Sequence, residues 1–172
     1  MKKLIIICSI VTMLLSCNSG SKNKTIQIED EIITHVSEDD KDMNRAMETA
    51  RASFDQFKKA FVEAQGNDQY HSFIIKIGFD SPQYGKEHMW VGDLKLKDDK
   101  FVGILSNTPT DPAIALNYGD TIVIDPAQIS DWMYIDSATG LTKGAYTFRV
   151  MRDAMSEKER MEFDEQTGIK LE

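Results

Sequence analysis

The chain has 172 residues, of which 28 are acidic and 20 are basic, and its formal net charge is −8 at pH 7. This balance argues against a nucleic-acid-binding protein, because such proteins present a basic surface. Two cysteines are too few for a disulfide framework or a cysteine-based zinc site. A hydrophobic share of 41% and a charged share of 28% are ordinary for a globular domain.

Residues 1–16 have the organisation of a secretory signal peptide. Lys2 and Lys3 precede a mostly apolar run that is too short for a transmembrane helix, which needs about 20 residues. The run ends in Leu14-Leu15-Ser16-Cys17, which resembles the signal of bacterial lipoproteins. That resemblance implies cleavage before Cys17 and acylation of this residue, by palmitate among other chains. The alternatives are an ordinary cleaved signal with a chance cysteine, or a buried N-terminal helix.

A lipidated Cys17 would tether the protein to a membrane of the cell envelope, and we expect the outer membrane with the domain facing the periplasm. Residues 17–36 are predicted to be a flexible, acidic tether, since Asn18 to Lys24 contain no apolar residue. No Pro- or Ser-rich linker divides residues 37–172. We therefore predict one domain over this range.

The first predicted element of the domain is an amphipathic helix. Ser37 and Asp40 form a weak capping box at its start, and Gly66 ends it. Apolar residues recur at spacings of three and four: Met43, Ala46, Met47, Ala50, Phe54, Phe57 and Phe61. This stripe predicts one long helix that packs across a sheet, with its phenylalanines in the core.

From Tyr70 the apolar period changes to two, which predicts a half-buried strand. Residues 87–97 and 100–107 are predicted to form a hairpin around Asp98 and Asp99. If the loop has two residues, the register has five pairs: Leu96–Phe101, Lys97–Lys100, Leu94–Gly103, Gly92–Leu105 and Trp90–Asn107. A longer loop is the alternative, because two aspartates are not the preferred hairpin dipeptide. This register places Trp90 on one face with Leu105.

Two further strands are predicted over 121–125 and 129–136, whereas residues 145–155 fit a helix or a strand. Ser156 and Glu159 form a capping box that starts a C-terminal helix. The predicted fold class is α+β: an N-terminal amphipathic helix packed on a bent, mostly antiparallel sheet of about five strands, with a C-terminal helix. Glycines inside the strands permit the bends: Gly78, Gly92 and Gly103.

The central block is similar to the YegJ-like family of bacterial domains, also called domain of unknown function 2314. The similarity is carried by five short segments: Glu87-His88-Met89-Trp90-Val91, 101–109, Gly119-Asp120, 129–133 and 144–149. Ala50, Arg51 and Phe54 match an alanine–arginine helix of the same family. The resemblance implies a small bacterial α+β domain that is often exported. It implies no activity and no catalytic residues.

A polar and aromatic pocket is predicted around His88. Strand alternation places His88 and Trp90 on one side of the sheet, and the register brings Asn107 opposite Trp90. Asp131 and Trp132 follow a turn and are predicted to join them, forming the wall of a ligand pocket. The competing interpretation makes both tryptophans core anchors and His88 a structural hydrogen-bonding residue.

Two classes of function stay open. The first is a non-catalytic binding module that recognises an envelope protein, a peptide or a glycan. An immunity-type protein that binds a basic toxin is a variant of it, since the acidic chain suits a basic partner. The second is a hydrolase-like enzyme in which Asp131 orients His88 as a general base. No Gly-rich phosphate loop, G-x-S-x-G or H-E-x-x-H motif is present, and we predict neither cofactor nor metal.

Overall fold

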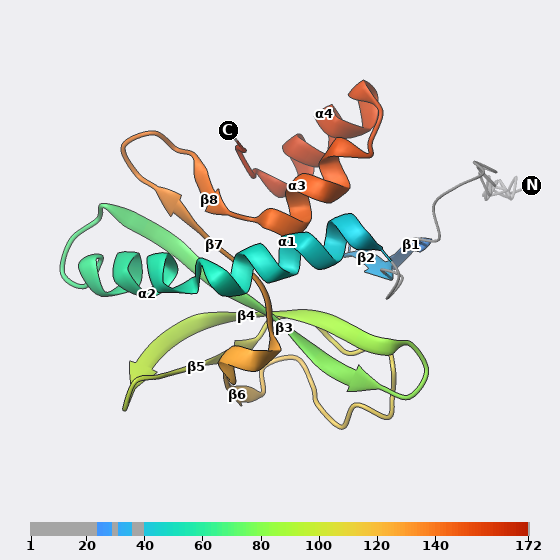
Figure 1. Ribbon diagram of the computed structural model, residues 1–172, viewed down its shortest axis with the longest axis horizontal. Helices are drawn as coiled ribbons and strands as arrows, with labels where there is room; N and C mark the ends of the chain where they lie inside the picture. The colour runs from blue at the N-terminus through green and yellow to red at the C-terminus, as the bar shows by residue number, and fades with distance from the viewer. Residues whose placement is uncertain (1–23, 29–30, 36–39, 172) are drawn as a thin grey trace, which may run out of the picture.

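The computed structural model describes residues 24–28, 31–35 and 40–171 (Figure 1). Its strands are β1 (Lys24–Ile28), β2 (Glu31–His35), β3 (Tyr70–Ser81), β4 (Gly85–Lys97), β5 (Lys100–Leu105), β6 (Thr121–Val123), β7 (Ile129–Asp136) and β8 (Thr142–Gly144). Its helices are α1 (Lys41–Ala52), α2 (Phe54–Glu63), the 3₁₀-helix η1 (Pro126–Gln128), α3 (Tyr146–Asp153) and α4 (Glu157–Thr167).

Six of these strands form one antiparallel sheet in the order β6-β5-β4-β3-β7-β8. In Figure 1, α1 and α2 run end to end across this sheet, and α3 and α4 lie beyond α1. The predicted α+β class is confirmed. The sheet has six strands rather than about five, because β8 lies in a segment whose glycines, Gly140 and Gly144, predict a loop. None of the helices in the described part of the chain is long and apolar enough to cross a bilayer.

The predicted long helix is divided in two at Ser53. The hydroxyl of Ser53 donates to the carbonyl of Thr49 at 2.7 Å, and the backbone of Ser53 leaves the helical region at ψ 5°. A serine hydroxyl bonded back to the preceding turn is a known cause of helix bending. Asp40 caps α1 by accepting hydrogen bonds from the amides of Asp42 and Met43. The predicted start at Ser37 lies outside the described residues.

A small hairpin lies inside the segment predicted to be a tether. Strands β1 and β2 pair antiparallel, with Lys24 opposite His35 and Ile28 opposite Glu31. These strands differ from the flexible tether predicted for residues 17–36, and the rest of that range lies outside the described part of the chain.

The β4–β5 hairpin keeps its predicted register only near the turn. The pairs found as predicted are Leu96–Phe101 and Lys97–Lys100. Farther along, Leu105 pairs with Val91 and not with Gly92, because Asp93 (φ +46°) lies in a bulge. Because of this bulge, the side chain of Val91 lies in the core beside Leu105, and Trp90 lies on the opposite face of the sheet.

The core is aromatic and is centred on Phe57 of α2. The Phe57 ring lies 5.4 to 5.6 Å from the rings of Phe54, Phe101 and Trp132. Each such pair contributes about 0.5–1.5 kcal/mol beyond the burial of its area. Trp132 is 1% exposed, and its indole N–H donates to the carbonyl of Ala50 at 2.8 Å. This bond ties β7 to the end of α1.

Candidate functional site

His88 lies on β4 directly opposite Gly78 of β3. A Cβ on residue 78 would lie 3.1 Å from Cε1 and 3.2 Å from Nδ1 of the imidazole. The glycine therefore leaves the space in which the ring lies. The Nδ1 atom is buried and has no hydrogen-bond partner among the described residues, which is a rare state for a buried nitrogen.

This imidazole borders a cavity of about 310 Å³, which we call the His88 pocket. Its walls come from α1, β3, the β3–β4 turn, β4, η1 and β7. The lining residues are Asn44, Met47, Arg51, Gly78, Tyr84, Lys86, His88, Ala127, Gln128 and Ser130. A second cavity of about 20 Å³ shares three of them, Met47, His88 and Ser130. The volume of the pocket is in the range of small-molecule sites.

The pocket holds its histidine in the neutral form at physiological pH. Burial of the ring and, in decreasing order of effect, the positive charges of Lys76, Lys86 and Arg51 together lower the pKa of His88 from 6.5 to about 4. A neutral imidazole has one donor nitrogen and one acceptor nitrogen. It therefore offers a hydrogen bond of either kind at Nδ1.

Lys76 shares a sheet face with His88 and separates it from Asp131. Its ammonium lies 5.3 Å from the ring centre of Trp90 and 5.7 Å from that of Phe148. The two rings are stacked on each other, with centroids 5.5 Å apart. Burial lowers the pKa of Lys76, and the nearby carboxylate of Asp131 partly offsets that effect. The ammonium of Lys76 thus lies over two aromatic rings, and the charge of Asp131 favours its protonated form.

Asp131 caps helix α3. One carboxylate oxygen accepts from the amides of Trp132 (2.8 Å) and Tyr146 (3.0 Å). The other accepts from the amide (2.8 Å) and the hydroxyl (2.6 Å) of Thr147. Burial raises the pKa of Asp131, whereas these hydrogen bonds lower it in part. With both oxygens engaged and the residue fully buried, the carboxylate holds α3 against β7.

The structure separates the five residues predicted to form one pocket wall. His88 lines the His88 pocket, whereas Trp90, Asn107, Asp131 and Trp132 do not. Asn107 accepts a hydrogen bond from the backbone N–H of Trp90 at 2.8 Å, so it closes the end of the hairpin. Trp90 faces α3, where its ring stacks on a phenylalanine, and Trp132 lies in the core. His88, Trp90 and Asp131 do share one sheet face, as the pairing of their strands requires.

Two cationic residues of the pocket were missed by the sequence analysis. Arg51 on α1 donates to the carbonyl of Ile129 at 3.0 Å, which fixes its guanidinium beside η1. Lys86 lies on β4, two residues before His88, and pairs with Asp80 at the exposed rim. The signal that could have located the pocket was Gly78, a glycine inside a strand opposite a histidine.

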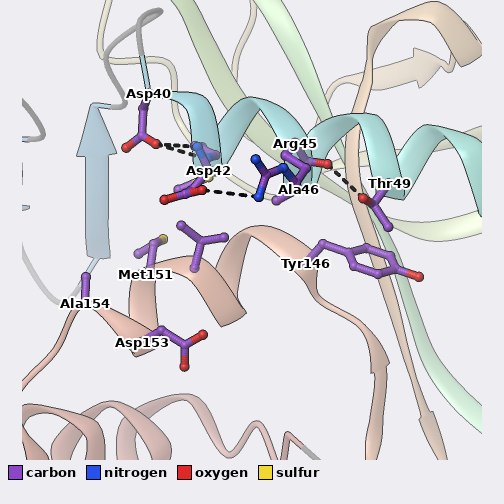
Figure 2. Close-up of a pocket in the computed structure, with 11 residues that line it drawn as sticks. Asp40, Asp42, Arg45, Ala46, Thr49, Tyr146, Met151, Asp153 and Ala154 are labelled. Carbon is purple, nitrogen blue, oxygen red and sulfur yellow. Dashed lines mark hydrogen bonds and ion pairs between the residues drawn. The ribbon is translucent and has the colours of Figure 1, made fainter.

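A wider groove of about 600 Å³ lies between α1 and α3 (Figure 2). Asp40, Asp42 and Asp153 lie at its edge, and Arg45 pairs with Asp42 at 3.7 Å in an exposed position. None of the residues known to line it carries a buried polar atom without a partner. Unlike the His88 pocket, the groove therefore presents, among its described residues, no buried polar atom without a partner that would orient a small ligand. Across the described ranges, no three His, Cys, Asp or Glu side chains come close enough to hold a metal ion.

The fold and the pocket together define a small α+β domain with a polar cavity between helix α1 and the sheet. The model of the family described as "Uncharacterized protein conserved in bacteria (DUF2314)" matches residues 40–171. The chain belongs to this family, as the similarity of its central block had indicated.

Two bacterial proteins are similar to this chain over part of their length. The chain is 32% identical over 145 residues to a Neisseria meningitidis serogroup B protein named "Putative ankyrin repeat protein", covering 81% of this chain and 56% of that protein. It is 31% identical over 111 residues to "Uncharacterized protein YegJ" of Escherichia coli K12, covering 63% of this chain and 66% of that protein. The chain thus spans between half and two thirds of the length of each of these relatives. No solved structure matches it.

Proposed function

We propose that this protein is a lipid-anchored, non-catalytic binding module of the bacterial cell envelope, and that it takes a small polar ligand in the His88 pocket. The observation that carries the binding role is His88, which lines a cavity and whose buried Nδ1 has no partner within the described residues. A buried nitrogen of this kind costs about 1–3 kcal/mol, and a ligand that bonds to it would recover that energy.

The anchor is proposed from the sequence alone. Leu14-Leu15-Ser16-Cys17 resembles the maturation site of bacterial lipoproteins. A single acyl chain binds a membrane only weakly, whereas two or more chains anchor a protein stably. On this proposal the domain stays at the surface of a membrane, and we place it on the periplasmic side of the outer membrane.

A hydrolase that uses His88 and Asp131 has one feature in its favour, the shared sheet face of the two residues. Against it, all four hydrogen bonds to Asp131 come from β7 and the start of α3. A carboxylate engaged in this way has little freedom to orient an imidazole. We therefore prefer binding to catalysis.

The binding role is tested by filling the pocket. We expect a library of small polar molecules to contain compounds that raise the melting temperature of the full chain, and Gln128→Trp to abolish these shifts by filling the pocket mouth. Gln56→Trp, at an exposed position of α2 outside the pocket, is the matched control and should keep them. Shifts that survive Gln128→Trp would place the ligand elsewhere and contradict the proposal.

The anchor is tested in a bacterial host by labelling with palmitate and by membrane fractionation. We expect the native chain to carry the label and to sediment with membranes, and Cys17→Ser to do neither. Cys8→Ser, which changes the only other cysteine, should behave as the native chain. A Cys17→Ser chain that still sediments with membranes would contradict the anchor and leave the pocket experiment untouched.

A further inference from the structure

The His88 pocket is basic in an acidic protein. The described side chains that line it include Arg51, Lys86 and His88, with no aspartate or glutamate among them. The whole chain carries a formal charge of −8. A cavity lined by charges of one sign concentrates the potential of those charges, because its walls exclude water. The pocket therefore attracts anions where the rest of the molecule repels them.

The cations of the pocket also have hydrogen-bond donors to spare. Arg51 has five N–H donors, and one of them is bonded to the carbonyl of Ile129. That bond holds the guanidinium in place. The ammonium of Lys86 has three donors and uses one on Asp80, whose carboxylate is 90% exposed. The donors that remain come from α1 (Arg51) and β4 (Lys86), two of the elements that line the cavity.

An oxyanion is the chemical group that matches this arrangement. Phosphates and carboxylates accept several charge-assisted hydrogen bonds at once, and arginine presents a fork that fits either group. A neutral ligand would leave Arg51 without a counter-charge among the described residues, whereas Lys86 is already paired with Asp80. A volume of about 310 Å³ leaves room for a few further atoms, which Met47 and Ala127 would contact.

We propose that the His88 pocket binds the oxyanion group, phosphate or carboxylate, of a small molecule or a lipid headgroup, with Arg51 and Lys86 as charged partners and His88 as a buried hydrogen-bonding partner. This inference rests on the proposed function and names the ligand class of the same site.

Anion binding is expected to be coupled to protonation of His88. The charged groups that face it directly or through a neighbour come from α1, β3, β4 and β7: Arg51, Lys76, Asp80, Lys86 and Asp131. Burial and the neighbouring cations together bring the pKa of His88 to about 4. A bound anion offsets their repulsion and raises this pKa. Binding then takes up a proton, and affinity increases as the pH falls toward 5.

The experiment is calorimetric titration of the full chain at low salt with inorganic phosphate, citrate and neutral glycerol, at pH 7.5 and pH 5.5. We expect phosphate or citrate to bind, glycerol not to bind, and affinity to be higher at pH 5.5. Arg51→Gln should lower the affinity about tenfold or more, as loss of a charge-assisted hydrogen bond does. Arg45→Gln, on the same helix but outside the pocket, should change it less than about twofold.

Two further variants isolate the histidine. His88→Gln should remove most of the difference between the two pH values, whereas His71→Gln, at an exposed position on β3, should retain it. A lipid source is tested with vesicles of phosphatidylglycerol against vesicles of phosphatidylcholine. Anion-dependent vesicle binding that Arg51→Gln weakens supports the headgroup as the source of the oxyanion, and binding of soluble phosphate or citrate supports a small molecule.

Each negative result separates the two proposals. A neutral compound that binds in the pocket while phosphate, citrate and anionic vesicles do not would overturn the oxyanion inference and leave the binding function standing. Anion binding that is equal in the Arg51→Gln and Arg45→Gln variants would also overturn it. Absence of any ligand whose binding Gln128→Trp abolishes would overturn both.

Discussion

Gly78 and His88 face each other across β3 and β4, and the imidazole of His88 occupies the space that a side chain at position 78 would need. The hydrogen bonds of the two strands fix this relationship, so a change at residue 78 acts directly on the ring that borders the pocket. Because Gly78 has no left-handed backbone, an alanine is compatible with its conformation and only the contact with the ring opposes it.

We predict that Gly78→Ala displaces the imidazole by a few tenths of an ångström and destabilises the protein by about 1–2 kcal/mol, as small over-packing changes do. In a His88→Ala background the same change should cost less than about 0.5 kcal/mol, because its only close neighbour is gone. Urea unfolding of the four proteins measures both values. An equal cost in the two backgrounds would show that the ring is not what limits residue 78.

Asp131→Asn tests whether the buried carboxylate is structural. Asparagine keeps the shape but turns an NH₂ group toward donors, so it loses at least the two bonds to Thr147 or the two to the other amides. We predict a loss of about 2–4 kcal/mol in the free energy of unfolding. Thr147→Ala removes a single hydroxyl bond and should cost about 1–2 kcal/mol. An Asp131→Asn protein of native stability would leave the carboxylate free for another role.

The sequence predicted the elements of the fold better than their junctions. Local periodicity was sufficient for the stripe that contains Phe57 and for the capping box at Ser156, because each feature depends on neighbours within one element. The bulge at Asp93 has no comparable signature in the sequence. The hydrophobic pattern does not show that this aspartate has a left-handed backbone. The extra residue in this bulge places Trp90 on the opposite face of the sheet from the predicted one.

The pocket was predicted only in part, because it also depends on contacts between separate elements. His88 was predicted as a site residue from its own strand. Arg51 reaches the same cavity from α1, 37 positions earlier in the chain, and only the packing of that helix against β7 brings the two together. Gly78 was interpreted as a bend, whereas its role is to leave room for the imidazole. Tertiary packing, which one sequence does not contain as a pattern, supplied what was missing.

Acid should destabilise the protein through His88. The pKa of this residue is about 4 in the folded state and 6.5 in the unfolded state, so the unfolded chain binds more protons between these values. Stability is therefore fully present above pH 6.5 and is lost as the pH falls through 4. The contribution is about 3 kcal/mol. The free energy of unfolding of the native protein, compared with that of His88→Gln, should therefore fall by about 3 kcal/mol between pH 7 and pH 4. Urea unfolding at the two pH values measures this difference. His71→Gln should track the native protein throughout, and a parallel pH profile for His88→Gln would refute the assignment.

The two lysines near His88 should differ in their effect on its pKa. Lys76 is the stronger influence because it is buried beside Trp90, whereas Lys86 is 54% exposed and paired with Asp80. Water and the counter-charge screen the second lysine more than the first. We therefore predict that Lys76→Met raises the pKa of His88 more than Lys86→Met does, followed as the titration of its imidazole proton in NMR spectra. Methionine keeps the length of the side chain and its contact with the aromatic rings, so the change removes mainly the charge. Lys59→Met, on the exposed side of α2, is the control and should leave the titration unchanged. An equal or larger effect of Lys86→Met would mean that the neutrality of His88 is set at the rim of the pocket and not by the buried ammonium.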